Sequence, residues 1–439
     1  MSSKWPVVRL GDHVDSCLGK MLDAKKNKGA PQPYLGNSNV RWGEFDLVDL
    51  AEMRFEATEE ERYSLRSGDL VICEGGEPGR CAIWSGPPGM KIQKALHRIR
   101  SMETLDNHYL LYWFRHAAKS GYLDSHFTGT TIKHLTGRAI AALEVPLPPV
   151  VTQRAMVDVL TALDDRIAQL RETNATLEAI AQALFKSWFV DFDPVRAKQQ
   201  GLAPAGMDEA TAALFPDIFE ELTSGLVPKG WECIDLAELT KRFEGSIQTG
   251  PFGSQLHASD YVESGVPVVM PKDIVNRRVS TGSVARIGAA DADRLSRHKL
   301  QTGDIVFSRR GDVERHALIT EREAGWLCGT GCLLLRPGLQ WQSPGFLSML
   351  LDAPRARTWL VQHAVGATMP NLNTGILGSV PVVLPSPFVL NAFEELVSMT
   401  EEQRSRNASM AETLATLRDT LLPRLISGQL RLPEVEAFT

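Results

Sequence analysis

The most constraining feature of this sequence is that its two halves repeat each other. A Gly-Asp-Leu-Val-Ile segment at 68–72 recurs as Gly-Asp-Ile-Val-Phe at 303–307, an offset of 235 residues. A second pair, 131–135 and 368–372, is offset by 237 residues. Solenoid repeats are about 20–50 residues long, so a period this large indicates a duplicated pair of domains. The chain is therefore expected to fold as two similar halves.

Each half ends in one long predicted helix. The first is expected from after Pro149 to about Phe189, and the second from about Phe388 to Ile426. Apolar steps that alternate between four and three residues over several heptads predict a coiled-coil seam. The predicted seam residues are Leu160, Leu163, Ile167, Leu170, Asn174, Leu177 and Leu184 in the first helix, and Leu396, Asn407, Met410, Leu414, Leu417 and Leu421 in the second.

A helix with such a seam needs a partner, and the duplicated helix is the nearest candidate. Asn174 and Asn407 fall at the same seam position in the two helices. A polar seam residue sets the register of a coiled coil at a cost in stability. We expect the helices to pack antiparallel with both Asn residues near the crossing. The alternative is that each Asn occupies a loose, solvated point of the seam.

The remainder of each half has short strand patterns separated by Gly, Pro, Asn and Asp turns. The predicted fold class is α+β: two duplicated globular α/β domains, separated by two long antiparallel coiled-coil helices, with pseudo-two-fold symmetry. The predicted parts are a first domain at 1–150, the first helix at 151–192, a linker at 193–225, a second domain at 226–386, the second helix at 387–428 and a tail at 429–439.

The formal net charge of −6 is unevenly distributed along the chain. An acidic total, taken alone, argues against a nucleic-acid partner. However, residues 1–150 carry +1 and residues 226–385 carry +2, whereas 151–225 carry −6 and 386–439 carry −3. The acidity therefore belongs to the helices and the linker, and the two mixed domains are slightly basic.

Basic and amide side chains cluster in both mixed domains. Lys and Arg bind phosphates, while Arg, Asn and Gln read base edges. One such cluster is usually a solvated face, but its recurrence beside the Gly-Asp motif favours DNA contact. The DNA-binding candidates are Lys25, Lys26, Lys28, Lys91, Lys94, His97, Arg98 and Lys133 in the first domain, and Gln248, Ser254, Gln255, Lys272, Asn276, Arg277, Arg278, Arg309, Arg310 and Arg315 in the second.

Several other classes of protein are disfavoured. No apolar run is long enough to span a bilayer, and no apolar signal core follows the N-terminus, so we expect a cytoplasmic protein without a membrane partner. Cys328 and Cys332 form a lone C-x3-C, which favours two buried side chains over a metal site. No P-loop or nucleophile elbow is present. We therefore expect a binding protein with no catalytic residue. The alternatives are an enzyme with an unrecognised nuclease or methyltransferase site, and a coiled-coil scaffold whose domains bind protein or sugar.

Five phrases carry a family likeness over essentially the whole chain. They are GDLVICEGGEPGR at 68–80, GTTIKHL at 129–135, LFKSWFVDFDPV at 184–195, MPNLN at 369–373 and LPRLISGQL at 422–430. Together with the alternation of mixed domain and long helix, they resemble the specificity subunit of Type I restriction-modification enzymes.

This resemblance implies a division of labour between the parts of the chain. The two mixed domains would be target-recognition domains, each reading one half of a bipartite double-stranded DNA site. The helices would set the spacing of the half-sites and dock two methyltransferase subunits, with restriction subunits joining through the complex. S-adenosylmethionine, ATP and Mg²⁺ would be bound by those partner subunits, and no cofactor by this chain.

Overall fold

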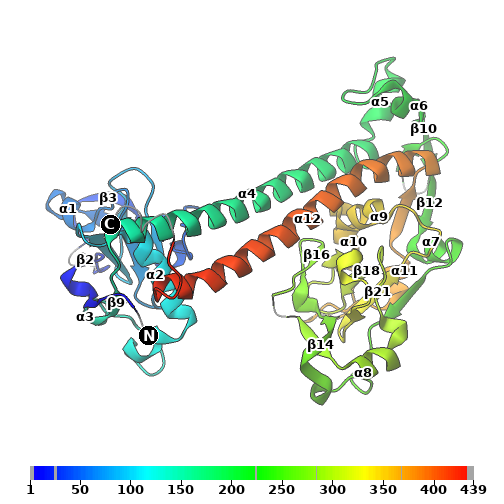
Figure 1. The fold of residues 1–439 in the computed structure, drawn as a ribbon. Coiled ribbons are helices and arrows are strands. Elements are labelled where there is room, and N and C mark those ends of the chain that lie inside the picture. The colour runs from blue at the N-terminus through cyan, green and yellow to red at the C-terminus, as the bar shows by residue number, and fades with distance from the viewer. Residues whose placement is uncertain (1–3, 24–26, 223–224, 283, 367, 433–439) are drawn as a thin grey trace. The chain divides into compact units, whose positions relative to one another are not determined.

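The computed structural model describes residues 4–23, 27–222, 225–282, 284–366 and 368–432 (Figure 1). The chain divides into two compact units, residues 1–172 with 407–439 (unit 1) and residues 173–406 (unit 2). Each unit contains one mixed segment and one half of each long helix. The predicted α+β class is confirmed. Lys25 and Lys26 lie outside the described residues.

The two long helices have the predicted ends. Helix α4 (Val150–Phe189) and helix α12 (Pro387–Ile426) each contain 40 residues. Helix α4 follows a Pro-Pro pair and α12 begins at a proline, a residue whose fixed φ suits the first helical turn. Gly428 has a φ of 70° just beyond α12, the left-handed conformation that ends many helices.

The helices run antiparallel within each unit. In unit 1, Arg418 of α12 donates a hydrogen bond to Asp164 of α4 at 2.5 Å. In unit 2, the rings of Phe185 and Phe393 are 6.1 Å apart. Further along α12, the Asn174 side-chain amide donates to the Arg404 carbonyl at 3.0 Å. The direction of packing is as predicted, and the mutual placement of Asn174 and Asn407 stays a prediction.

The predicted seam of α12 needs a correction. Its members Leu396, Met410 and Leu417 are exposed, whereas Val397 and Ala411 are buried. At every second position of the predicted seam, the buried residue is therefore the next one along the chain. Two arginines explain the difference, because they complete the face with ion pairs that an apolar pattern does not contain. These pairs are Arg404 with Glu178 and Arg418 with Asp164.

The mixed segment of unit 1 is built on a four-stranded antiparallel sheet, with the strand order β2-β8-β5-β6. A three-stranded sheet, β4-β3-β7, and a two-stranded sheet, β1-β9, accompany it. The bounds are β1 Val7–Arg9, β2 Val14–Leu18, β3 Ala30–Leu35, β4 Ala51–Phe55, β5 Leu70–Cys73, β6 Cys81–Ile83, β7 Lys91–Ile92, β8 Leu96–Ser101 and β9 Glu144–Pro146. The helices of four or more residues are α1 Glu60–Tyr63, α2 Asn107–Lys119 and α3 Gly137–Ala142.

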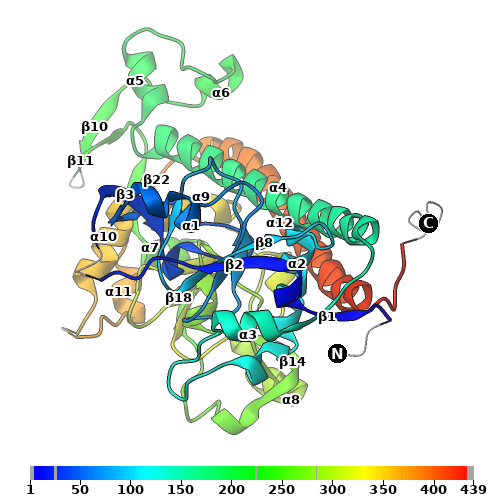
Figure 2. The same cartoon turned by 90° about the vertical axis from the view of Figure 1, so that its left-hand side faces the viewer.

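Helix α2 joins the mixed segment of unit 1 to α4 (Figure 2). The Asp106 carboxylate caps its N-terminus by accepting from the amide of His108 at 2.8 Å. The Tyr112 hydroxyl and the Arg115 guanidinium both donate to Asp164 of α4, at 2.9 and 2.8 Å. Desolvation by burial and the Asp164 charge raise the pKa of Tyr112. The hydroxyl therefore stays protonated and available as a donor.

Unit 2 repeats this architecture with the sheet β13-β21-β18-β19 and a second sheet, β17-β14-β20. Its two-stranded sheets are β10-β11, β12-β22 and β15-β16. The strand bounds are β10 Phe219–Leu222, β11 Gly225–Pro228, β12 Glu232–Asp235, β13 Ser246–Thr249, β14 Tyr261–Val269, β15 Ile274–Val275, β16 Arg278–Val279, β17 Ala285–Ile287, β18 Ile305–Ser308, β19 His316–Leu318, β20 Leu327–Cys328, β21 Cys332–Arg336 and β22 Pro381–Leu384. The helices are α5 Asp193–Gln199, α6 Glu209–Ala213, α7 Leu236–Arg242, α8 Ala289–Arg294, α9 Pro344–Asp352, α10 Pro354–His363 and α11 Thr374–Gly378.

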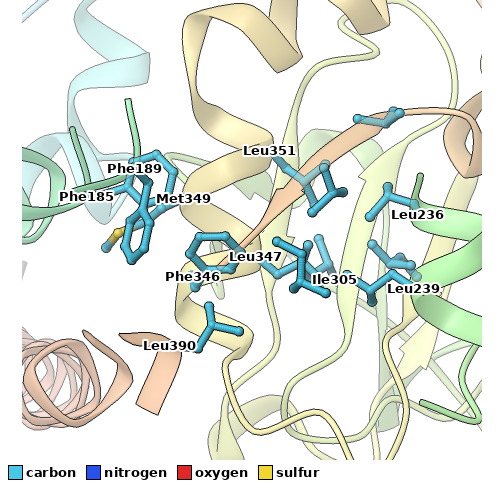
Figure 3. Close-up of a cluster of buried hydrophobic side chains, with 14 of the residues drawn as sticks. Phe185, Phe189, Leu236, Leu239, Ile305, Phe346, Leu347, Met349, Leu351 and Leu390 are labelled. Carbon is cyan, nitrogen blue, oxygen red and sulfur yellow. The ribbon is translucent and has the colours of Figure 1, made fainter. Parts of the chain in front are cut away.

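The core of unit 2 lies between the long helices and the four-stranded sheet (Figure 3). Phe189 of α4 packs edge-on against Phe346 of α9, with ring centroids 4.8 Å apart. Ile305 of the sheet and Leu236 of α7 belong to the same buried cluster. Each long helix therefore buries one face in the core of this unit. The segment predicted as a linker, 193–225, forms α5, α6 and β10, which lie beyond the C-terminal end of α4 (Figure 1), and β10 pairs with β11 at the start of the predicted second domain.

The repeated Gly-Asp motif has the same structural role in both units. The Asp69 carboxylate accepts two hydrogen bonds from Arg100, at 2.8 and 3.0 Å. The Asp304 carboxylate accepts two from Arg336, at 2.8 and 2.7 Å. Each Asp also accepts from the backbone amide three residues before it, at 2.8 Å. The motif therefore ties β5 to β8, and β18 to β21, through buried bidentate ion pairs.

Candidate nucleic-acid interface

Four loops of unit 1 meet at one end of the four-stranded sheet. They are held by backbone hydrogen bonds from Gly19 N to Leu96 O at 2.9 Å, from Glu74 N to Ala95 O at 2.8 Å and from Leu135 N to Glu74 O at 2.7 Å. The first two bonds extend the sheet beyond its regular strands. We refer to these loops as the sheet-end loops of unit 1: 19–22, 92–95, 74–77 and 128–135.

The same four loops recur in unit 2 with the same hydrogen bonds. Gly250 N donates to Cys332 O, Arg309 N to Gly331 O and Leu372 N to Arg309 O, each at 2.9 Å. The sheet-end loops of unit 2 are 250–256, 329–331, 309–312 and the described residues 365–366 and 368–372. The backbone arrangement is thus common to both units, although the side chains on it differ.

The last sheet-end loop of each unit is a tight hairpin tip that requires glycine. Gly129 and Gly366 have φ values of 92° and 116°. A Cβ on Gly129 would lie 2.3 Å from the Ile132 carbonyl oxygen, and one on Gly366 would lie 2.6 Å from that of Met369. Only glycine fits both the conformation and the space. The tips present Ile132 and Met369 to solvent.

Two guanidinium groups of the unit 2 loops lack a carboxylate partner among the described residues. Arg310 is exposed, and Arg309 is half-buried with a buried Nε that has no hydrogen-bond partner among the described residues. Within the described part of the chain, neither guanidinium has a carboxylate within 4 Å. By contrast, Arg315 pairs with Asp312 at 2.7 Å. Arg309 and Arg310 are therefore available for an external anion.

The equivalent loops of unit 1 carry a different set of charges. Lys94 is half-buried and Lys133 is exposed, with its ammonium 5.6 Å from the centre of the Phe127 ring. Glu74 occupies the position that Arg309 has in unit 2, and its Oε2 lies 3.9 Å from Nε2 of His97. Burial lowers the pKa of His97 although Glu74 opposes the shift. Position 74/309 therefore carries opposite charges on one backbone arrangement.

Three basic candidates of unit 1 are engaged inside the protein or lie apart. Lys91 is fully buried and donates to Glu60 and Ser64. Arg98 is buried and pairs with Asp15 at 2.8 Å. Lys28 is exposed and lies in the chain between β2 and β3. A role for these three residues in DNA binding stays a prediction, with Lys91 and Arg98 already paired.

The basic pair at the β15–β16 turn faces the long helices. Asn276 and Arg277 form the turn, with φ values of 48° and 60°. Arg277 is buried and pairs with Glu178 of α4 at 2.6 Å, while Arg278 pairs with Glu401 of α12. A left-handed arginine is unfavourable unless its surroundings hold it there, as this ion pair does. The pair therefore anchors the hairpin to α4 and α12 within unit 2.

A pocket of about 640 Å³ lies beside this anchor, within unit 2. Its walls carry both signs of charge, including Glu314, Arg315 and Asp352. His316 also lines it, and burial lowers the pKa of that ring to about 4, so it is neutral near pH 7. Among the described residues, no three His, Cys, Asp or Glu side chains are grouped as metal ligands. Cys328 is buried with a free thiol.

Of the remaining candidates of unit 2, two form hydrogen bonds with main-chain atoms and two are exposed. The Gln248 amide donates to the Arg297 carbonyl at 2.7 Å, and Gln255 Oε1 accepts from Phe252 N at 3.1 Å. Ser254 and Lys272 are exposed. Sequence reasoning missed the exposed apolar residues of the loops, among them Phe252. Alignment of the two halves could have found them, because they occupy equivalent positions.

Comparisons with known proteins agree on one family. Residues 2–179 match the family model described as Type I restriction modification DNA specificity domain. The HindI Type I restriction enzyme specificity subunit of Haemophilus influenzae is 28% identical over 339 residues, covering 68% of this chain and 72% of that protein. The MjaIX specificity subunit of Methanocaldococcus jannaschii is 23% identical over 437 residues, covering 98% and 94%.

A solved structure shows the same fold. The S subunit of a Type I restriction-modification system from M. genitalium has a TM-score of 0.57 at 15% identity, and the match covers 96% of each chain. No helix among the described residues has the length and apolar character needed to cross a membrane.

Proposed function

The chain belongs to the family of Type I restriction-modification specificity subunits, and from this premise we propose that its sheet-end loops bind DNA. The unneutralised guanidiniums of Arg309 and Arg310 are the observation that carries the proposal. Phosphate oxygens and guanine edges are the anionic and acceptor groups that arginine binds in DNA. Each unit presents one set of loops, so each reads one half of a bipartite site.

In this proposal the chain recognises the DNA sequence and holds the partner subunits, and it has no catalytic residues. We place S-adenosylmethionine, ATP and Mg²⁺ on the partner subunits, and assign no cofactor to this chain. Two modification subunits would dock on the long helices, and restriction subunits would join through the complex. The exposed apolar side chains of α12 support such docking, because they lie on its solvent side. They are Phe388, Leu396 and Met399 in unit 2, and Met410 and Leu417 in unit 1.

The test is DNA binding by the complex with its modification subunits. Methylation mapping in cells that carry the complex first identifies the site. The Arg309→Ala/Arg310→Ala variant is then compared with the wild type over a salt titration. The logarithm of the association constant falls as the logarithm of the salt concentration rises, and each lost phosphate contact makes this slope less steep by about 0.9. We expect weaker binding at low salt and a slope reduced by one to two.

A matched control removes the same charge elsewhere in unit 2. Arg242 and Arg286 are both exposed, and each is hydrogen-bonded within the protein. Arg242 donates to Glu232 at 3.0 Å, and Arg286 donates to the Gly265 carbonyl at 3.0 Å. The Arg242→Ala/Arg286→Ala variant should bind nearly as well as the wild type. Equal affinities and slopes for both double variants would exclude Arg309 and Arg310 from the DNA interface.

A further inference from the structure

Large apolar side chains are exposed at equivalent positions of the sheet-end loops in both units. Met21 of unit 1 and Phe252 of unit 2 lie in the first loop, with 52% and 53% of their surface exposed. Ile132 and Met369 lie in the last loop, with 64% and 60% exposed. A single exposed apolar residue is ordinary. Recurrence at two equivalent positions, on loops joined to the sheet by the same backbone hydrogen bonds, indicates a shared use.

The first loop of unit 2 is ordered around its exposed ring. The Phe252 amide donates to Gln255 Oε1 at 3.1 Å, and the Gln255 amide donates back to the Phe252 carbonyl at 2.8 Å. The Leu256 amide also bonds that carbonyl, at 3.2 Å, and its side chain is buried in the core. The turn is thus anchored while the ring faces solvent, so the ring loses little freedom on contact with a ligand.

The two apolar positions flank the basic residues. In unit 2, backbone hydrogen bonds join the four loops side by side, as in neighbouring strands. The order across them is the loop of Gly250, that of Gly331, that of Arg309 and that of Leu372. Neighbouring strands are about 4.8 Å apart, so the first and last loops are separated by about 15 Å. This is close to the roughly 12 Å width of the DNA major groove. The arrangement across the loops of unit 2 is therefore apolar, basic, apolar.

The major groove offers one apolar group to such a surface, the C5-methyl group of thymine. We propose that Phe252 and Met369 contact thymine methyl groups in the half-site of unit 2, and that Met21 and Ile132 do so in the half-site of unit 1. These four residues would then determine sequence specificity, beside Arg309 and Arg310 in unit 2 and beside Lys94 and Lys133 in unit 1. The inference rests on the proposed DNA binding, and goes further by naming the group that is recognised.

The experiment removes the methyl group without changing base pairing. Duplexes carrying the mapped site receive deoxyuridine in place of thymidine, one position at a time. Their affinity for the complex with its modification subunits is measured for the wild type, Phe252→Ala and Met369→Ala. Loss of one buried methyl contact lowers affinity about fourfold. We expect that loss at one or more thymidines with the wild type, and no such loss at the same position with the corresponding alanine variant.

Control variants separate this contact from general effects. Leu339 is the most exposed large apolar residue described in unit 2, and it follows β21 at the opposite end of the sheet. Leu339→Ala should retain the full deoxyuridine effect. Phe252→Leu, which keeps an apolar side chain, should retain part of it. Ile132→Ala is the matching test for the half-site of unit 1.

The outcomes distinguish this inference from the proposed function. Absence of salt-dependent DNA binding by the wild-type complex would refute both. Binding that is indifferent to deoxyuridine at every position would overturn the inference alone. A Phe252→Ala variant that loses affinity equally for thymidine and deoxyuridine duplexes would also overturn it, and would indicate a side chain wedged between base pairs instead.

Discussion

Replacement of Asp304 by alanine should selectively destabilise unit 2. The Asp304 side chain is 2% exposed and that of Arg336 is 23% exposed, so the variant leaves a largely buried guanidinium without its carboxylate. It also leaves the Gln301 amide without its acceptor, now at 2.8 Å. Breaking a buried ion pair by removing one partner costs about 3–5 kcal/mol. Because Arg336 is partly exposed, we expect about 3 kcal/mol.

Hydrogen exchange followed by mass spectrometry on the full chain can locate this loss. We expect faster exchange in peptides from β18 and β21, with unit 1 peptides unchanged. A domain of 150–250 residues loses about 2–4 °C of Tm per kcal/mol, so the unit 2 transition should fall by about 6–12 °C. Asp69→Ala should produce the reciprocal pattern, with the loss confined to β5 and β8.

The control is an aspartate whose ion pair is exposed. Asp312 pairs with Arg315 at 2.7 Å, but the two side chains are 58% and 52% exposed. Exposed pairs contribute about 0–1 kcal/mol, so Asp312→Ala should change little. If Asp304→Ala were no more destabilising than Asp312→Ala, the repeated motif would not hold the sheet together as described.

Two further predictions concern pH and spacing. Glu394 of α12 accepts from the amides of Gly345 and Phe346 at the start of α9, at 3.0 and 3.2 Å. Burial, with help from Glu401, raises its pKa from 4.5 to about 7. The folded state then holds this proton more tightly than the unfolded state, so stability falls as pH rises from about 4.5 to 7, by up to about 3 kcal/mol. In Glu394→Gln, the unit 2 unfolding temperature should fall less across that range in calorimetric scans; an identical slope would assign the dependence to other groups. Separately, inserting about four residues in α4, or the same number in α12, should change the spacer of the bipartite site, since four helical residues add about 6 Å. Methylation mapping that returned the original spacer would show that the helices do not measure it.

The sequence predicted the elements that depend on long patterns. Both helices follow from heptad spacing, since a 40-residue amphipathic pattern leaves few alternatives, and their pairing was expected because each seam needs a partner. The buried face of α12 did not follow, because Arg404 and Arg418 replace apolar residues on it. Sequence reasoning also grouped Arg277 with Arg309 as equal candidates. Their difference depends on Glu178, which is 99 positions before Arg277 and reaches it only in the folded unit.

Hydrogen bonds between main-chain atoms hold the sheet-end loops in place, and the tips of the last loops also require glycine. The same arrangement accepts Glu74 in one unit and Arg309 in the other. Under the proposed function, substitutions at these positions can therefore change the DNA sequence that is recognised while the main-chain hydrogen bonds of the loops stay in place. A gene duplicated on such a plan gains two readers that diverge independently. Their combinations multiply, so a small number of loop variants can yield a large number of distinct bipartite addresses.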